Sequence, residues 1–319
     1  MEPTVPDGST LKCPRVSVIV LNWNGLDDTI ECLESLRKVD YPDYRVVVVD
    51  NGSTGWDSRV LRERFGGWAV VVENDRNYGY AEGNNIGIRY AVKHYDPSYL
   101  LLLNNDTVVD PGFLSAMIEG ALTDPAIAIV GPKIYWYDER ERIQSAGGSF
   151  EWWSLHRSVR GAGEVDRGQF DQMTEVDWVS GSALLISQDA VQKVGLLYPA
   201  FFAYSEEIDW CARCKRVGYK VWFAPGARVW HKCAWTPRGI SALQLYYMMR
   251  NRYLFMRRNA SKTQFAFFFV HYTLRSLLVS PVSILLHHRN PKLLLTSFNA
   301  VFAGIAWSVI GPRGTEERL

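Results

Sequence analysis

Apolar runs that end in polar clusters recur through the first third of the chain. Four consecutive leucines lie within residues 99–110, and the polar triplet at 104–106 follows them directly. An apolar run without alternation is typical of a strand that is buried on both faces of a parallel sheet. Residues 16–25 and 44–54 repeat the pattern, because each is rich in valine and ends in Asn, Asp, Gly or Ser. The pattern predicts buried strands with polar carboxyl ends.

Segments with helical periodicity separate these strands. In residues 26–39, apolar positions recur every three or four residues, with acidic residues early and basic residues late, as the helix dipole favours. Residues 57–65 and 84–94 are further expected helices, and 68–74 is an expected strand between them. The alternation predicts an α/β fold with a mainly parallel, Rossmann-like sheet, right-handed crossovers and helices on both faces.

The polar clusters at the carboxyl ends of the strands mark the expected ligand site. In open α/β sheets, ligands bind outside this edge. Asn and Asp also begin turns, so one cluster alone is equally consistent with a turn. Repetition of the clusters favours a polar ligand that carries phosphate. The chain has neither GxxxxGKS/T nor GxGxxG after its first strand, which argues against Walker-type ATPases and Rossmann-type dinucleotide enzymes.

The later part of the chain combines short strands with an acidic helix start. Residues 127–172 mix apolar stretches with Gly- and Trp-rich ones and predict short strands and loops over the sheet edge. Residues 175–195 predict a strand, a turn of small residues and a helix. The next helix opens on the carboxylates of Glu206, Glu207 and Asp209, and the short strands KVWFAP and ARVWH follow it.

The net charge of +1 conceals a sharp separation of charge along the chain. From Met1 to Asp209 there are 18 Lys and Arg against 32 Asp and Glu, a balance of −14. From Trp210 to Gly314 there are 16 Lys and Arg and no acidic residue, and the last five residues contribute −1. We therefore expect the C-terminal third to face something anionic, either nucleic acid or a membrane surface.

Apolar residues in the same third of the chain distinguish these two partners. Residues 241–262 predict an amphipathic helix, and 264–286 and 293–310 are apolar runs barely long enough to cross a bilayer. Arg275 within the first run would cost about 2.5–3.5 kcal/mol near mid-membrane, so peripheral or monotopic contact of residues 241–310 with an anionic leaflet fits better. A homodimer through these helices is the alternative. Nucleic acid would not explain the apolar runs, and we expect none to bind.

The cysteines and the N-terminal residues bear on the compartment. Five cysteines are odd in number and scattered, so we expect reduced thiols rather than a disulfide framework. Cys211 and Cys214 form a CxxC, but no second pair completes a zinc site. Residues 1–14 predict a disordered lead-in without the apolar run of a signal peptide. A cytosolic environment fits these features.

Seven sequence blocks carry a family resemblance. They lie in order between about residues 15 and 235 and resemble family-2 glycosyltransferases of the GT-A fold, in particular rhamnosyltransferase-like members. The blocks are VSVIVLNWNG, VVVVDNGST, NDRNYGYAEGNNIGI, LLLLNNDTVVDPGFL, VDWVSGSALLIS, FFAYSEEIDWCAR and PGARVWH. The chain departs from the family pattern in its metal motif, NND instead of NPD or DxD, and in its acidic motif, EE instead of ED. The resemblance implies a GT-A domain over 15–240, followed by a helical segment over 241–319.

The resemblance also implies a reaction. Such enzymes transfer a sugar, with inversion, from a nucleotide-diphosphate donor, here dTDP-rhamnose or a UDP- or GDP-sugar, to a lipid-linked or cell-surface glycan acceptor. Dependence on Mg²⁺ or Mn²⁺ follows from the same resemblance. The basic and apolar C-terminal third and the expected cytosolic environment predict a place on the cytoplasmic face of the cell membrane. A non-catalytic relative that keeps the fold and binds sugar nucleotides or glycans is the alternative.

Residues at the ends of the first four strands are the candidate donor site. By resemblance, Asp50 accepts a hydrogen bond from a pyrimidine N–H, although an Asx-turn is the alternative. Trp23 either stacks on the base or belongs to the core. Arg76 is either a phosphate ligand or an exposed charge. The glycines after the third strand permit close approach of backbone to the donor. The further donor candidates are Asn22, Asn24, Asn51, Ser53, Asn77, Gly79, Gly83, Asn84, Asn104 and Asn105.

Two residues are the candidate metal ligands. Asp106 ends the leucine-rich segment, where a carboxylate can hold a divalent cation against a diphosphate. His231 matches a position that ligates metal in some relatives, although a lone histidine is more often structural. With a histidine ligand, Mn²⁺ is as plausible as Mg²⁺.

The acidic motif supplies the candidate catalytic base. An acceptor hydroxyl must lose a proton as it attacks, and by position in the motif Glu207 takes it, while Glu206 and Asp209 orient that base or bond backbone. Crowded carboxylates raise one another's pKa, which suits a base near neutrality. Acids at a helix start also simply complement its dipole. The acceptor-side candidates are Trp178, Ser180, Gly181 and Ser182.

Overall fold

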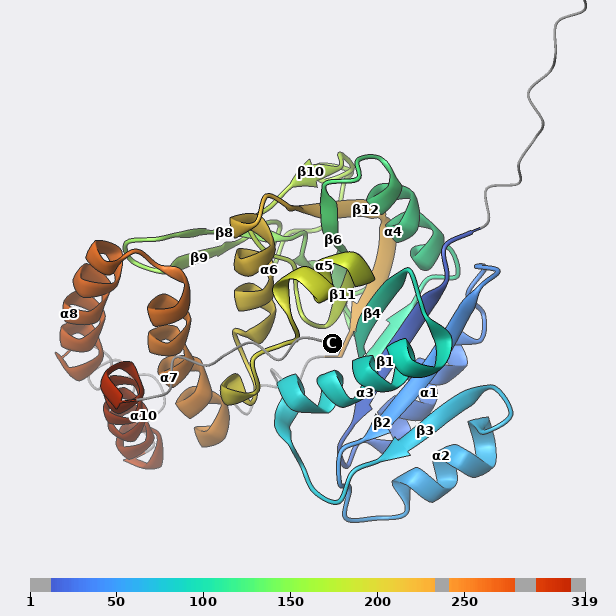
Figure 1. Cartoon of the computed structure of the whole chain (residues 1–319), viewed down its shortest axis with the longest axis horizontal. Coiled ribbons are helices and arrows are strands. Elements are labelled where there is room, and N and C mark those ends of the chain that lie inside the picture. Colours follow the sequence, from blue (N-terminus) through green and yellow to red (C-terminus); the bar gives the residue numbers. More distant parts are fainter. Residues whose placement is uncertain (1–12, 233–240, 279–290, 311–319) are drawn as a thin grey trace, which may run out of the picture.

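The computed structural model describes residues 13–232, 241–278 and 291–310 (Figure 1). Residues 1–12 of the expected lead-in and 279–286 of the first apolar run lie outside the described residues. Within them, a sheet with helices on both faces occupies one side of the molecule, and the C-terminal helices lie together on the other side (Figure 1).

Four parallel strands form one half of the main sheet. They are the predicted apolar runs, in the order β4-β1-β2-β3. Asn22 of β1 pairs with Asp50 of β2, and Leu21 pairs with Asn104 of β4. The polar strand ends therefore meet at one edge, as the pattern predicts. The strands are β1 (Val16–Asn22), β2 (Tyr44–Asp50), β3 (Ala69–Glu73) and β4 (Tyr99–Asn104).

The other half of the sheet is mixed. β11 pairs antiparallel with β4 and β6, and β12 pairs parallel with β6. KVWFAP and ARVWH form one strand rather than two, because β12 continues through a register shift between Ala224 and Arg228. These strands and the short ones beside them are β5 (Thr107–Val109), β6 (Ile127–Trp136), β7 (Ile143–Ser145), β10 (Thr174–Glu175), β11 (Ala183–Ser187) and β12 (Lys220–His231).

Two cores cover the faces of the sheet. Alternate strand residues point to opposite faces, so Ile19 and Leu102 belong to the core that includes α3, α5 and α6, while Val18 and Leu101 belong to the core that includes α1, α2 and α4. The helices are α1 (Leu26–Leu36), α2 (Asp57–Phe65), α3 (Gly79–Tyr95), α4 (Phe113–Leu122), α5 (Gln188–Val194) and α6 (Glu206–Arg216), with a 3₁₀ turn η1 (Pro199–Phe201).

Helix α3 begins at Gly79, earlier than the expected start near residue 84. Side-chain oxygens satisfy the backbone at its beginning, because Asn77 Oδ1 accepts from the Gly79 N–H at 2.7 Å and Asn51 Oδ1 accepts from the Tyr78 N–H at 3.2 Å. Such capping removes the cost of the unpaired N–H groups of a first helical turn. The hydrogen bonds from these two asparagines therefore stabilise a helix start at Gly79.

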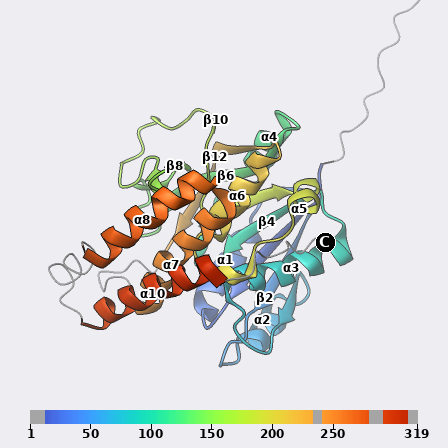
Figure 2. The same cartoon turned by 60° about the vertical axis from the view of Figure 1, so that its left-hand side comes forward.

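A hairpin and three helices complete the described chain. β8 (Gly148–Glu151) and β9 (His156–Val159) pair as a separate two-stranded sheet that extends toward α7 and α8 (Figure 1). The helices are α7 (Ala242–Asn259), α8 (Lys262–Leu278) and α10 (Pro291–Ile310), grouped on one side of the molecule (Figure 2). Among the described residues, no helix is both long and apolar enough to cross a membrane.

Candidate active site

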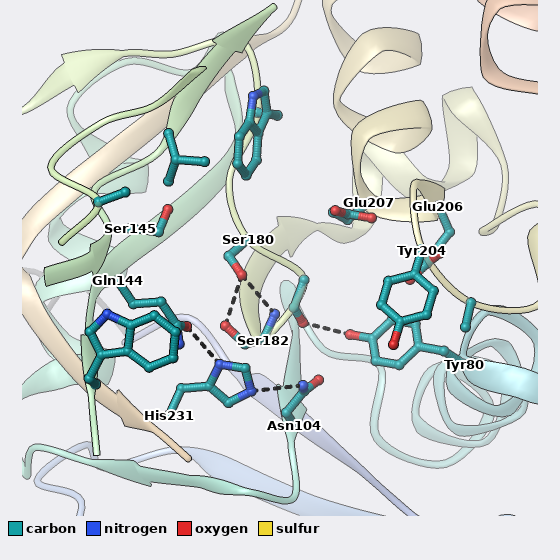
Figure 3. A pocket seen from close by; sticks show the side chains of 16 residues that line it. Tyr80, Asn104, Gln144, Ser145, Ser180, Ser182, Tyr204, Glu206, Glu207 and His231 are labelled. Carbon is teal, nitrogen blue, oxygen red and sulfur yellow. Dashed lines mark hydrogen bonds between the residues drawn. The ribbon is translucent and has the colours of Figure 1, made fainter. Parts of the chain in front are cut away.

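A cavity of about 580 Å³ opens at the carboxyl edge of the sheet (Figure 3). The end of β4 supplies Asn104, the end of β12 supplies His231, and the start of α6 supplies Glu206 and Glu207. The fold thus brings together residues from distant parts of the chain, because parallel strands end at a shared edge.

His231 is held in one tautomer at one wall of the cavity. Its Nδ1 lies 2.7 Å from Gln144 Oε1, and an amide oxygen only accepts hydrogen bonds, so Nδ1 carries the proton. The Nε2 atom is then free to act as a ligand. It lies 3.4 Å from Asn104 Nδ2 and 3.2 Å from Asp106 Oδ1. A histidine fixed through its other nitrogen is typical of a metal ligand.

The atoms around His231 fit a divalent cation. Within the described chain, Asp106 Oδ1 and Asn104 Oδ1 are buried and accept no hydrogen bond, which is costly unless a ligand compensates. Two oxygens and one imidazole nitrogen suit Mn²⁺ or Mg²⁺. No group of three or more His, Cys, Asp or Glu side chains that could hold a metal ion occurs among the described residues, so substrate phosphates and water would have to complete the coordination. Burial by itself raises the pKa of Asp106, but in the state in which a proton lies between Asp106 and Nε2 the contact with His231 outweighs burial and holds that pKa below its ordinary value.

Glu206 and Glu207 face the cavity from the first turn of α6. Burial and the charge of Glu207 raise the pKa of Glu206 well above its ordinary value. Burial also raises the pKa of Glu207, while the nearby Arg157 opposes the shift. The Oε2 atom of each is buried and has no hydrogen-bond partner in the part of the chain that the structure describes. A partly exposed, unpaired carboxylate with a raised pKa, as Glu207 is, suits a base that works near neutrality.

The structure places Asp209 away from the cavity. Its side chain is fully buried, and Arg213 Nε at 2.8 Å, Arg258 Nε at 3.1 Å and Asn259 Nδ2 at 2.7 Å donate to it. Burial raises the pKa of Asp209, but the two guanidinium groups outweigh burial and keep the carboxyl ionised. Asp209 thus joins α6 to α7 and does not reach the cavity that Glu206 and Glu207 line.

The acceptor-side candidates line the same cavity, and Ser180 and Ser182 lie between His231 and Glu207 (Figure 3). Ser180 Oγ and Ser182 Oγ lie 2.9 Å apart, and the Tyr80 hydroxyl donates to Gly181 O at 2.6 Å. Trp178 also lines the cavity, and its Nε1 donates to Ser149 O at 3.3 Å. All four predicted residues therefore lie in one cavity with the carboxylates.

The loops after β1 and β2 are tied to each other. Asn22 Nδ2 lies 3.2 Å from Asp50 Oδ1, and Ser53 Oγ donates to the same oxygen at 2.5 Å. Asn24 accepts from Thr54 N at 2.8 Å. Trp23 projects from this edge with 51% of its surface exposed, so it does not belong to the core. Trp23 follows Asn22, which bonds the buried Asp50 carboxylate, and a flat exposed ring near such a carboxylate in the chain is a suitable place for a nucleotide base.

Several donor candidates are instead used within the protein. Asn51 is buried and donates to Asn77 Oδ1 at 3.0 Å and to Gly79 O at 3.1 Å. A Cβ on Gly79 would lie 2.5 Å from the Phe202 ring, and one on Gly83 would lie 2.6 Å from a Leu21 methyl carbon. The close approach that these glycines allow is therefore between protein elements.

Three further donor candidates also contact protein groups. Asn84 is buried and donates to Tyr80 O at 2.9 Å, and Asn105 donates to Thr29 Oγ1 at 3.0 Å, at the start of α1. Arg76 is exposed, with its guanidinium 4.8 Å from the centre of the Tyr78 ring. Asn105 thus bonds helix α1, whereas its neighbour Asn104 faces His231 in the cavity.

Sequence reasoning missed several residues of the site, and three of them bear directly on its chemistry. Tyr80 and Gln144 line the cavity, and Arg157 acts on it through its charge. Burial and the charges of Glu206 and Glu207 raise the pKa of Tyr80 well above its ordinary value, so its hydroxyl stays protonated. Tyr80 lies within a quoted block, but the segments that hold Gln144 and Arg157 show no cluster that marks them as functional.

Most of the chain matches one known protein family. A family model described as glycosyltransferase like family 2 matches residues 14–252. The chain belongs to glycosyltransferase family 2. The relatives of this glycosyltransferase include a hexosyltransferase of low-salt glycan biosynthesis, Agl10 of Haloferax volcanii, which is 27% identical over 83% of this chain and 82% of its own length. The rhamnosyltransferase WbbL of Escherichia coli is 22% identical over 77% of this chain and 96% of its own length.

A third relative and two solved structures are also glycosyltransferases. The N-acetylglucosaminyl-diphospho-decaprenol L-rhamnosyltransferase of Mycobacterium tuberculosis is 23% identical over 66% of this chain and 74% of its own. The mannosyltransferase PcManGT of Pyrobaculum calidifontis, in complex with GDP-Man and Mn²⁺, has a TM-score of 0.56 and 18% identity over 92% of this chain and 75% of its own. GalNAc-T7 with UDP, GalNAc and Mn²⁺ has a TM-score of 0.57 and 18% identity over 69% of this chain and 43% of its own. The glycosyltransferase therefore has the GT-A fold, which confirms the expected fold class.

Proposed function

We propose that this glycosyltransferase moves a sugar, with inversion, from a nucleotide-diphosphate donor to a hydroxyl group of a glycan or lipid-linked acceptor. One observation carries the proposal: two carboxylates with raised pKa values share a single cavity with the Asn104 and His231 ends of β4 and β12 (Figure 3). A base on one side and a diphosphate site on the other are the two parts that a direct displacement needs.

The side chains divide the work of that displacement. Glu207 accepts the proton from the acceptor hydroxyl as its oxygen attacks the anomeric carbon, and Trp178 and Ser180 shape the acceptor side. Asp106 and His231 would hold a divalent cation, which when bound offsets negative charge on the leaving diphosphate. The imidazole nitrogen favours Mn²⁺ over Mg²⁺, and Mn²⁺ accompanies both structural neighbours described above.

The donor fits the loops after β1 and β2. We assign the nucleotide base to the exposed face of Trp23 and to the Asp50 carboxylate, with Arg76 near the phosphates. Two relatives are named as rhamnosyltransferases, which supports dTDP-rhamnose as the first donor to test. UDP-sugars and GDP-mannose are the next, because they match the ligands named for the structural neighbours.

The C-terminal helices fit a membrane surface that presents a lipid-linked acceptor. Their outward residues include Phe267, Val270, Leu274 and Leu295, each more than half exposed, and the basic residues of this third of the chain complement anionic lipid. One relative is named for an acceptor of this kind, a diphospho-decaprenol. We place the protein at the cytoplasmic face of the cell membrane. A second copy of the chain is the competing partner for these helices.

The deciding experiment is a panel of sugar nucleotides with Mn²⁺ or Mg²⁺. Release of nucleoside diphosphate in the presence of acceptor identifies the donor, and Glu207→Gln is the matched background. Binding of a sugar nucleotide without release would favour the non-catalytic relative. For the helices, cosedimentation with anionic vesicles is compared between the wild type and Phe267→Ser/Leu274→Ser. Equal cosedimentation of the two, with dimers in solution, would favour the second copy.

A further inference from the structure

The turn that leads into the acidic motif has an unusual backbone. Phe202, Tyr204 and Ser205 have φ values of 63°, 71° and 77°, in the left-handed region that residues other than glycine rarely adopt. Glu206 and Glu207 follow directly and begin α6. The direction of both carboxylates therefore depends on a turn that would relax if nothing held it.

Helix α7 holds this turn through Asn251. The Asn251 side chain is completely buried, and its Nδ2 lies 2.9 Å from Phe201 O, 2.7 Å from Ala203 O and 2.6 Å from Tyr204 O. Phe201 O also accepts from the Ala203 N–H at 2.7 Å, and the Asn251 amide supplies side-chain donors where the turn departs from the regular hydrogen bonding of a helix or strand. One amide thus fixes three carbonyls of the turn.

Two neighbours on α7 support Asn251. Arg250 Nε donates to Asn251 Oδ1 at 2.8 Å, which leaves the Asn251 N–H groups facing the turn, and Arg250 Nη2 donates to Ala200 O at 2.5 Å. Tyr247 stacks on Phe202, with ring centres 4.9 Å apart, and the Arg250 guanidinium lies 4.8 Å from the centre of the Tyr247 ring. Helix α7 therefore holds the turn in two ways: Asn251 hydrogen-bonds its carbonyl groups, and Tyr247 stacks on Phe202.

Helix α7 also contacts the residues that follow the two carboxylates in the chain. Arg258 and Asn259, at the end of α7, both donate to Asp209 in the first turn of α6. α7 thus contacts residues 200–204 before Glu206 and residue 209 after Glu207. A helix placed only to attach the protein to a surface would not need buried polar contacts on both sides of the proposed base.

We propose that Asn251, supported by Arg250 and Tyr247, is a positioning residue for Glu207: it holds the strained turn 202–205 and so sets the direction and the burial of the carboxylate. This inference rests on the proposed function, in which Glu207 is the base. It makes α7 part of the catalytic machinery and not only a support for α8 and α10.

The experiment compares Asn251→Ala with Gln244→Ala in the full-length protein. Gln244 completes a capping box with Ser241 at the start of the same helix, so its removal weakens α7 without removing a hydrogen bond to the carbonyls of the turn. We expect Asn251→Ala to lower kcat at least tenfold while the dissociation constant of the nucleotide stays within twofold of wild type. Gln244→Ala keeps kcat within twofold.

Two readouts separate positioning from simple loss of stability. A loosened turn lets water reach Glu207, so the acidic limb of the kcat profile moves to lower pH in Asn251→Ala and not in Gln244→Ala. Hydrogen exchange of residues 200–212 rises in Asn251→Ala alone. Tyr247→Leu, which removes the ring from Phe202, serves as the second variant and is used if Asn251→Ala does not fold.

Wild-type kcat in folded Asn251→Ala, or in Tyr247→Leu where that variant takes its place, overturns the inference. An equal loss of kcat in Gln244→Ala overturns it as well, because the effect would then follow helix stability. Failure of the proposed function looks different, since in that case the wild type itself transfers no sugar from any donor.

Discussion

His231 Nε2 lies 3.2 Å from Asp106 Oδ1, and the other ring nitrogen of His231 is bound to Gln144 Oε1 at 2.7 Å. The pairing of β5 with β12 brings them together, since Thr107 is opposite His231 in that ladder. A carboxylate beside an unprotonated imidazole nitrogen is a stable arrangement only when a cation or a proton lies between them. Substitution of either residue therefore tests whether the two hold a cation together.

Asp106→Asn and His231→Ala should each reduce transfer about 100-fold or more at a fixed Mn²⁺ concentration, because each removes one of the two protein ligands that we assign. The Mn²⁺ concentration for half-maximal activity, and Mn²⁺ binding in the presence of nucleoside diphosphate, are the measurements. His156→Ala, on the exposed hairpin, is the control. Full activity of His231→Ala at low Mn²⁺ would remove His231 from the site.

Gln144→Leu should weaken Mn²⁺ binding about 10–100-fold, because the amide oxygen that keeps the His231 ring in position is lost. Gln144→Glu should bind Mn²⁺ as well as the wild type, since a carboxylate accepts the same N–H. Mn²⁺ titration of both variants makes the comparison, with the exposed Gln169→Leu as control. Equal affinities in Gln144→Leu and wild type would contradict the outer-ligand role.

Glu207→Gln should lower kcat by about 10²–10⁴ with nucleotide affinity unchanged, because an amide cannot take the acceptor proton. Glu206→Gln should retain more activity, since Glu206 is the more deeply buried carboxylate and lies farther from solvent at the start of α6. Single-turnover transfer with bound donor separates chemistry from binding. The reverse order of the two variants would assign the base to Glu206.

Transfer should fall as the pH drops through the pKa of Glu207, which burial raises above the ordinary glutamate value. The base must be ionised to work, so the acidic limb lies above the pH at which a solvent-exposed glutamate titrates. Arg157→Met removes a positive charge that lowers this pKa, and the limb should move to still higher pH. Exposed Arg167→Met is the control. A limb that moves to lower pH would show that Arg157 does not act on the base.

Asp209→Asn should reduce the free energy of unfolding by about 3–5 kcal/mol, because it leaves buried Arg213 without its carboxylate. Asp189→Asn, which breaks an exposed pair with Lys193, should cost less than about 1 kcal/mol. Denaturant unfolding compares the two. The lowered pKa of Asp209 means that its contribution is present above the ordinary aspartate pKa and is lost as pH falls below it. A loss below 1 kcal/mol would contradict the assignment of Asp209 as a structural link.

Local patterns were sufficient for the elements and for the edge at which the site lies. The runs that became β1, β2 and β4 end in Asn22, Asp50 and Asn104, and parallel pairing must place such ends side by side. The same patterns could not divide the polar residues by role. Asn104 faces His231, whereas its neighbour Asn105 bonds the start of α1, and adjacent residues in a sequence carry no sign of that difference.

The sequence by itself determined the family, the order of strands and helices, and the candidate base and candidate metal ligands that we expect near one edge, because these follow from periodicity and from short blocks of residues. Only the tertiary structure decided which side chains meet. In it, Asp209 pairs with Arg258 and Gly79 packs against Phe202. Gln144 bonds His231 at the cavity, and Arg157 lies near enough to act on Glu207 through its charge. Such contacts join distant parts of the chain, so they depend on the packing of whole elements rather than on any local pattern.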